Sequence, residues 1–141
     1  MICFENVSKT YPGKNSAISN VCFNVSDGET LGIIGPIGAG KTTLLRILAG
    51  LIKPTDGNLN SDIDKKSVGY MPATEGLIYN LSVLDNLRIW SGAYNASEDN
   101  MNELIDFFKM SSYVDKKVFQ LSSGLRIITA FACAVIGNSK L

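Results

Sequence analysis

The sequence contains no histidine, which removes the side chain most often used as a general base or metal ligand near neutral pH. It also has no surplus of either charge, since 13 Lys and Arg residues balance 13 Asp and Glu residues. Proteins that grip nucleic acid carry a basic stripe against the phosphates, so the balanced charge predicts no nucleic-acid partner. Cysteine is scarce, and Cys3, Cys22 and Cys133 are expected to pack as small hydrophobic side chains.

Long hydrophobic runs are missing as well. No stretch approaches the about 18 to 20 apolar residues that cross a bilayer, and the longest candidate, residues 127–137, is short and contains Thr129. The first residues lack a charged segment followed by an apolar core, so no secretory signal is expected. The 141 residues, 45% of them hydrophobic and 18% charged, fit one soluble globular domain in the cytosol.

The first third of the chain favours β-strands. Residues 2–7 open an extended stretch, and residues 21–25 alternate between apolar and polar side chains as a half-buried strand does. Residues 31–34 form a nearly continuous apolar run, which is typical of a strand that is covered on both faces and central in its sheet. Residues 68–71 are expected to form another short strand.

Helical patterns begin at Thr42, where apolar residues recur at helical spacing until Gly50 marks the end of the helix. The pattern Ser82-Val83-Leu84-Asp85 is typical of a capped helix start, and Ser97 is expected to start another helix with an acidic, solvated face. Residues 73 to about 120 are therefore expected to be a helical insertion on an α/β core.

A glycine-rich loop carries the chemistry of this sequence. Residues 35–42 match the pattern G-x-x-x-x-G-K-[ST] in full, between the apolar run and the first helix. The glycines let the loop curl so that successive N–H groups point inward, and the start of the helix adds positive potential. Lys41 is expected to reach the β and γ phosphates, and the Thr42 hydroxyl to ligate Mg²⁺. The pattern predicts binding of a nucleoside triphosphate, and a ligand-free glycine turn is the alternative. The expected nucleotide-binding residues of this loop are Gly35, Pro36, Ile37, Gly38, Ala39, Gly40, Lys41, Thr42 and Thr43.

Together with Leu44-Leu45-Arg46, Leu48-Ala49-Gly50-Leu51 and Pro54-Thr55-Asp56-Gly57, the loop resembles the ATP-binding subunits of ABC transporters. The resemblance covers essentially all 141 residues. It implies an α/β fold: a P-loop NTPase core of the ABC ATPase type with an N-terminal antiparallel β portion and a helical insertion. It further implies a partial ABC ATPase domain, with a nucleotide-binding core over residues 1–72, a helical subdomain over 73–120, and a signature-like motif with its following helix over 121–141.

Two further positions gain a meaning from this resemblance. Tyr11 stands where the family places an aromatic ring that stacks on adenine, and an ordinary half-exposed tyrosine at a strand end is the alternative. Ala73 occupies the place of the family's glutamine. A methyl group can neither coordinate Mg²⁺ nor orient an attacking water, so this departure weakens the case for hydrolysis while leaving phosphate binding intact.

Residues 121–126, Leu-Ser-Ser-Gly-Leu-Arg, resemble the family's signature motif, which caps the γ-phosphate of ATP held by the opposite subunit. Ser123 and Leu125 depart from that motif, where the family has a glycine and a glutamine. The resemblance implies contacts in trans from Ser122, Ser123 and Gly124, because a hydroxyl and backbone amides at a helix start can receive phosphate. An ordinary N-cap by Ser122 is the alternative.

The family's next strand carries a magnesium-binding Asp and a catalytic Glu, and a switch histidine follows it. By the spacing from Leu121, Leu141 corresponds to the first residue of that strand. No catalytic residue is therefore assigned, and the sequence is expected to be a fragment or a truncated product that lacks the C-terminal part of the sheet. An open sheet edge beside residues 31–34 is expected to make the isolated chain marginally stable or self-associating.

The resemblance implies an ATP-binding subunit that binds Mg-ATP, forms a homo- or heterodimer, and drives transport by membrane-spanning subunits from the cytoplasmic face of the membrane. One alternative is a non-hydrolysing nucleotide-binding module or a regulatory ABC-type protein, which would not copurify with a membrane protein. A second alternative is an unrelated P-loop kinase or GTPase, which predicts no Leu-Ser-x-Gly element before a late helix.

Overall fold

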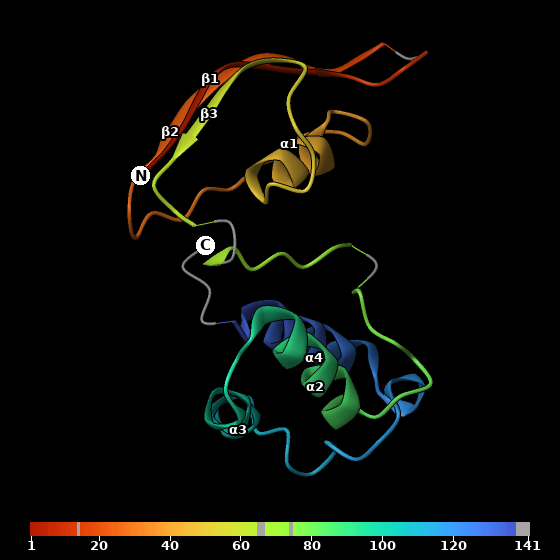
Figure 1. The fold of residues 1–141 in the computed structure, drawn as a ribbon. Coiled ribbons are helices and arrows are strands. Elements are labelled where there is room, and N and C mark those ends of the chain that lie inside the picture. Colours follow the sequence, from red (N-terminus) through yellow and green to blue (C-terminus); the bar gives the residue numbers. More distant parts are fainter. Residues whose placement is uncertain (14, 65–66, 74, 138–141) are drawn as a thin grey trace. The chain divides into compact units, whose positions relative to one another are not determined.

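The computed structural model describes residues 1–13, 15–64, 67–73 and 75–137 (Figure 1). The chain is made of two compact units, Met1–Lys65 and Lys66–Leu141. The first, called the sheet unit below, contains the β-sheet and helix α1. The second, called the helical unit, contains helices α2, α3 and α4.

Strand β1 (Ile2–Thr10) is the central strand of a three-stranded antiparallel sheet, between β2 (Ser16–Val25) and β3 (Asp56–Ser61). The strands expected at residues 2–7 and 21–25 are confirmed by β1 and β2. Strand β3 was missed, because its sequence Asp-Gly-Asn-Leu-Asn-Ser carries little intrinsic strand preference. It forms through pairing with β1, where Leu59 lies opposite Phe4.

One face of the sheet packs against helix α1 (Lys41–Leu48), as Figure 1 shows. Phe4 is almost fully buried and stacks on Phe23 of the neighbouring strand, with ring centroids 4.4 Å apart. From α1, Leu44 and Ile47 join the same core, at the i, i+3 spacing of one helix face. This packing fixes the start of α1, and with it the end of the glycine-rich loop, against the sheet.

The strands expected at residues 31–34 and 68–71 are wrong for this structure, which has no strand in either segment. Leu31 is 44% exposed and Ile34 is 97% exposed, so this apolar run is not a buried central strand. A fully buried parallel strand requires hydrogen-bonded neighbours on both sides, and no strand within the described ranges pairs with residues 31–34.

Serine side chains start each α-helix of the helical unit: α2 (Val83–Tyr94), α3 (Glu98–Phe107) and α4 (Ser123–Val135). Ser82 Oγ accepts from the backbone N–H of Asp85 at 3.0 Å, and Ser97 Oγ accepts from that of Asn100 at 3.2 Å. The helix starts expected at Ser82 and Ser97 are confirmed. The short 3₁₀-helix η2 (Val118–Gln120) precedes α4.

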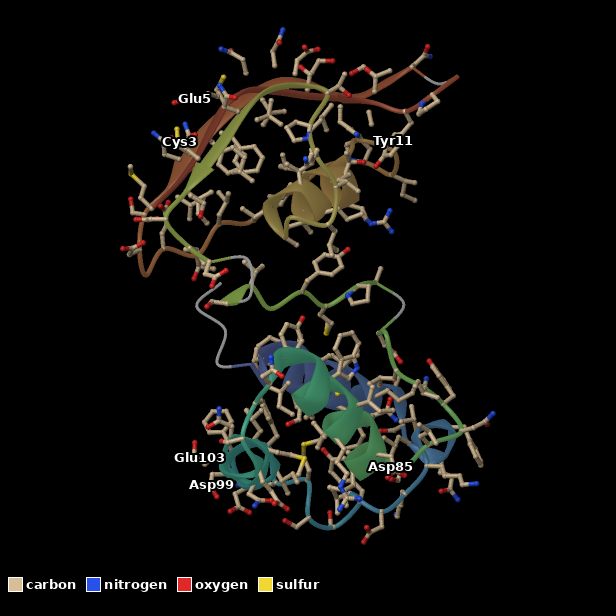
Figure 2. All side chains as sticks on the ribbon, in the orientation of Figure 1. Cys3, Glu5, Tyr11, Asp85, Asp99 and Glu103 are labelled. Atoms are coloured by element: carbon tan, nitrogen blue, oxygen red, sulfur yellow. The ribbon has the colours of Figure 1, made fainter. Side chains whose placement is uncertain are left out.

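The helical unit has its own hydrophobic core, which α2, α3 and α4 share. On α3, Asp99 and Glu103 are exposed, which confirms the solvated acidic face (Figure 2). Cys133 of α4 is buried, and burial raises the pKa of its thiol to about 12, as expected of a packing cysteine. Cys22 is exposed, however, so the expectation of a packed side chain is wrong there. Among the described residues, no helix combines the length and apolar character that a membrane span requires.

A buried amide braces the loop before α2. Asn86 is 1% exposed, and its Nδ2 donates to the carbonyls of Ile78 at 3.0 Å and Ser82 at 2.9 Å. Its Oδ1 accepts from the N–H of Ile78 at 2.7 Å. The side chain therefore bonds to three backbone groups of the segment before α2, and it supplies the acceptor for the N–H of Ile78.

Replacing Asn86 with leucine is expected to lower the free energy of unfolding of the helical unit by about 2 kcal/mol. The N–H of Ile78 loses its acceptor, and the carbonyls of Ile78 and Ser82 each lose one of two donors. Urea unfolding followed by the fluorescence of Trp90, the single tryptophan, would measure this loss. The same change at the exposed Asn102 of α3 is the control, and it is expected to cost under about 0.5 kcal/mol. Equal losses from the two variants would contradict the bracing role.

Candidate nucleotide-binding site

The glycine-rich loop, residues 35–40, leads directly into α1. Gly40 is the N-cap residue, with φ of 86°, and no side chain caps this helix. The carbonyl of Gly40 accepts from the N–H of Leu44 at 2.9 Å, which closes the first helical turn. The first-turn N–H groups of an α-helix have no acceptor within the helix, so α1 presents free donors at the end of the loop. Such an arrangement favours an anion.

A cavity of about 220 Å³ opens at this helix start. The residues that line it come from the loop, from the first turn of α1 and from strand β2: Ala17, Gly38, Ala39, Gly40, Lys41, Thr42 and Thr43. Six of the nine residues expected at the loop site lie beyond Ile37, and all six line the cavity. Gly35, Pro36 and Ile37 are exposed at the start of the loop.

Close contact with β2 fixes the position of the loop. A Cβ atom added at Gly40 would lie 2.3 Å from the carbonyl oxygen of Ala17 and 2.4 Å from Cγ2 of Ile18. Only glycine fits there, since these distances are shorter than any contact between non-bonded heavy atoms. Gly38 has the same φ of 86°, but a Cβ atom there would meet nothing within 4 Å.

Lys41 folds its side chain back over the loop. Its Nζ donates to the carbonyl of Gly35 at 2.8 Å and to that of Pro36 at 2.7 Å. The ammonium therefore lies against the first two carbonyls of the loop, and it holds the start of the loop close to α1. The Thr42 side chain, next along the helix, is exposed beside the cavity.

Tyr11 lies beside the same helix, directly after β1 (Figure 2). Its hydroxyl is 3.5 Å from Oγ1 of Thr43, a long contact that joins the end of β1 to the first turn of α1. The Nζ of Lys9 lies 5.6 Å from the centroid of the Tyr11 ring. The structure thus brings Tyr11 together with the cavity-lining residue Thr43, and stacking of Tyr11 on a base stays a prediction.

The signature-like residues belong to the helical unit. Ser122 is the N-cap residue of α4, and its Oγ accepts from the N–H of Leu125 at 3.3 Å. Ser122, Ser123 and Gly124 are all exposed. This capping bond matches the N-cap reading of Ser122, and it leaves the trans contact as a prediction.

An ionic cluster that includes Arg126 of this motif was not predicted from the sequence. Oε2 of Glu75 lies 3.6 Å from Nε of Arg126 and accepts from the hydroxyl of Tyr79 at 2.9 Å. That hydrogen bond raises the pKa of Tyr79. Arg126 Nη1 also donates to the carbonyl of Leu121 at 3.2 Å. The cluster connects the loop after Ala73 to the start of α4. No local sequence pattern predicts it, because Glu75 and Arg126 are far apart in the sequence.

Magnesium would find one protein ligand in this site, the exposed hydroxyl of Thr42. Mg²⁺ keeps several waters and is held by few protein oxygens together with substrate phosphates, so a single hydroxyl beside an anion site fits it. The part of the chain that the structure describes contains no group of three or more His, Cys, Asp or Glu side chains able to hold a metal by themselves.

Comparison with known proteins identifies the family. The sequence profile of the family described as "ABC transporter" matches residues 18–141, which include the glycine-rich loop and the signature-like motif. The chain belongs to the ABC transporter family. The predicted family is thereby confirmed.

Two curated relatives within the ABC transporter family are named for opposite directions of transport, one for import and the other for export. The zinc import ATP-binding protein ZnuC of Rickettsia conorii is 34% identical over 141 residues, which cover 100% of this chain and 60% of that protein. The Nod factor export ATP-binding protein I of Rhizobium etli is 31% identical over 153 residues, which cover 99% of this chain and 48% of that protein. The chain therefore spans about half to three-fifths of the length of these relatives.

Solved structures of ABC cassettes share the fold. The dimeric structure of MJ0796, described as a bacterial ABC transporter cassette, matches with a TM-score of 0.82 and 30% identity, over 99% of this chain and 71% of that chain. The same cassette in a post-hydrolysis state, bound to ADP and Pi, matches with a TM-score of 0.81 and 29% identity, over 99% of this chain and 71% of that chain. The predicted ABC ATPase fold is confirmed.

Proposed function

We propose that this chain binds Mg-ATP at the cavity before α1 and serves as the ATP-binding subunit of an ABC transporter. The observation that carries the proposal is the uncapped start of α1, which opens into a cavity lined by the glycine-rich loop and Lys41. Free N–H groups and one ammonium together form a site for a polyanionic chain of phosphates. The ADP and Pi of the related cassette support the choice of nucleotide.

Each residue of the site has a distinct role in this proposal. The amides of residues 38–43 bind the phosphates, and Lys41 exchanges its contacts with Gly35 and Pro36 for the β and γ phosphates. The Thr42 hydroxyl holds Mg²⁺, which neutralises phosphate charge when it is bound. Tyr11 stacks on the adenine ring.

The proposed assembly extends beyond the loop. Ser122, Ser123 and Gly124 would meet the γ-phosphate of a nucleotide held by a second ATP-binding subunit. The dimeric state of the related cassette supports the pairing of two such subunits. The nucleotide-binding core would comprise residues 1–72, the helical subdomain 73–120, and the signature-like motif with its helix 121–141. We place the subunit on the cytoplasmic face of a membrane, in contact with membrane-spanning subunits.

A second candidate function is that of a nucleotide-binding module that does not hydrolyse ATP. Ala73 favours it, because a methyl group stands where the family's glutamine is expected and cannot orient an attacking water. Both candidates share the phosphate site, so they differ in phosphate release and not in binding.

Thermal unfolding with and without nucleotide tests the proposal. Mg-ATP at about 100 times its dissociation constant is expected to stabilise the chain by about 2.7 kcal/mol, which raises the melting temperature. Mg-AMP, which lacks the β and γ phosphates, is the control and is expected to leave the melting temperature unchanged. Equal shifts with the two nucleotides would contradict phosphate recognition. Steady phosphate release from the same sample would exclude the non-hydrolysing module.

A further inference from the structure

Lys9 covers one face of the Tyr11 ring. Lys9 is the last residue but one of β1, and Tyr11 directly follows the strand. The Lys9 Nζ lies 5.6 Å from the ring centroid, within the range of about 6 Å at which an ammonium is attracted to an aromatic face. This ammonium therefore occupies a face on which a base could otherwise stack.

The ammonium is itself held in place. Lys9 Nζ donates to the backbone carbonyl of Lys53 at 2.7 Å, in the segment that follows α1. The tip of the Tyr11 ring lies against α1 as well, with its hydroxyl 3.5 Å from Oγ1 of the buried Thr43. The ring is thus restrained at one face and at its tip. The contact at the tip connects it to α1, which starts at the phosphate cavity, and the contact at the face connects it to the segment after α1.

We propose that Lys9 is a positioning residue for the nucleotide base. It covers one face of Tyr11 and leaves the opposite face for adenine, at a fixed place relative to the phosphate loop. This inference rests on the proposed function, in which Tyr11 stacks on adenine. A ring that is ordered before the ligand arrives loses less conformational freedom on binding, so the restraint strengthens binding of the base in particular.

Binding of Mg-ATP compared with binding of magnesium and inorganic tripolyphosphate, which has no base, tests the inference. Lys9→Met keeps most of the aliphatic stem and removes the charge. It is expected to weaken Mg-ATP binding about two- to fivefold, in line with the strength of an exposed cation–π contact, and to leave tripolyphosphate binding unchanged. Lys9→Arg keeps a cation over the ring and is expected to restore the affinity for Mg-ATP.

Two further variants separate positioning from other effects. Lys53→Met removes a nearby positive charge and keeps the carbonyl that accepts from Lys9, so both affinities are expected to stay at the wild-type value. Tyr11→Leu removes the ring and is expected to weaken Mg-ATP binding about tenfold, with tripolyphosphate unaffected. Circular dichroism of each variant checks that the chain is folded.

Different failures have different meanings. Equal weakening of both ligands by Lys9→Met would show a general charge effect and overturn the positioning role. If Lys9→Met leaves Mg-ATP binding unchanged while Tyr11→Leu weakens it, the positioning role of Lys9 is overturned and the stacking of Tyr11 on adenine is retained. Wild-type protein that binds neither ligand would overturn the proposed function, and this inference with it.

Discussion

Replacing Lys41 with alanine is expected to weaken Mg-ATP binding by about 100-fold. The ammonium would contact two phosphate groups, and each charge-assisted hydrogen bond contributes about 1.5 to 3 kcal/mol, so the loss of both amounts to at least about 3 kcal/mol. The substitution also removes the contacts of Lys41 Nζ with the carbonyls of Gly35 and Pro36, which hold the loop in the free chain. Without these contacts, the loop of the free chain is less restrained in the conformation that binds phosphate.

Equilibrium dialysis with labelled ATP measures this affinity directly. Arg46→Ala is the matched control, because it removes one positive charge from the last turn of the same helix, away from the cavity. Its affinity is expected to stay within about twofold of the wild type, since exposed charges are screened in salt. An affinity of Lys41→Ala within threefold of the wild type would show that this ammonium does not bind the phosphates.

A second large effect is expected at Gly40, where alanine should destabilise the sheet unit by about 2 to 5 kcal/mol. The added Cβ would lie 2.3 Å from the carbonyl oxygen of Ala17, so the loop or strand β2 would have to move. The residue also adopts φ of 86°, which costs a non-glycine residue about 1 to 2 kcal/mol. Overpacking adds about 1 to 3 kcal/mol to that cost.

Gly38 provides the matched control for this prediction. It has the same φ of 86°, and a Cβ atom there would meet nothing within 4 Å. Gly38→Ala is therefore expected to cost only the backbone penalty of about 1 to 2 kcal/mol. Urea unfolding followed by circular dichroism would compare the two variants. Equal losses would mean that the tight approach of Gly40 to β2 does not constrain the loop.

Local signals account for what the sequence predicts correctly. Helix α1 and the serine-capped starts of α2 and α3 depend on residues within one turn of each other, and all three are present. The phosphate loop is predictable for the same reason, because its glycines, Lys41 and Thr42 are consecutive or nearly so. Residue type and spacing thus identify the chemistry of the site.

Contacts between distant segments account for what the sequence does not predict. Strand β3 exists because it pairs with β1, and the apolar run at residues 31–34 is exposed because no described strand pairs with it. The placement of Lys9 over Tyr11 depends on the carbonyl of Lys53, and the cluster of Glu75 and Arg126 joins a loop to a later helix. Hydrophobic periodicity carries no information about these partners.

Isothermal titration of Mg-ATP into the folded wild-type chain tests the central claim, that the loop before α1 binds a triphosphate. We expect a saturable heat with one nucleotide per chain, and for the Lys41→Ala variant a heat that saturates only at about 100-fold higher Mg-ATP concentration. A heat no larger than that of dilution, from protein that circular dichroism shows to be folded, would contradict it.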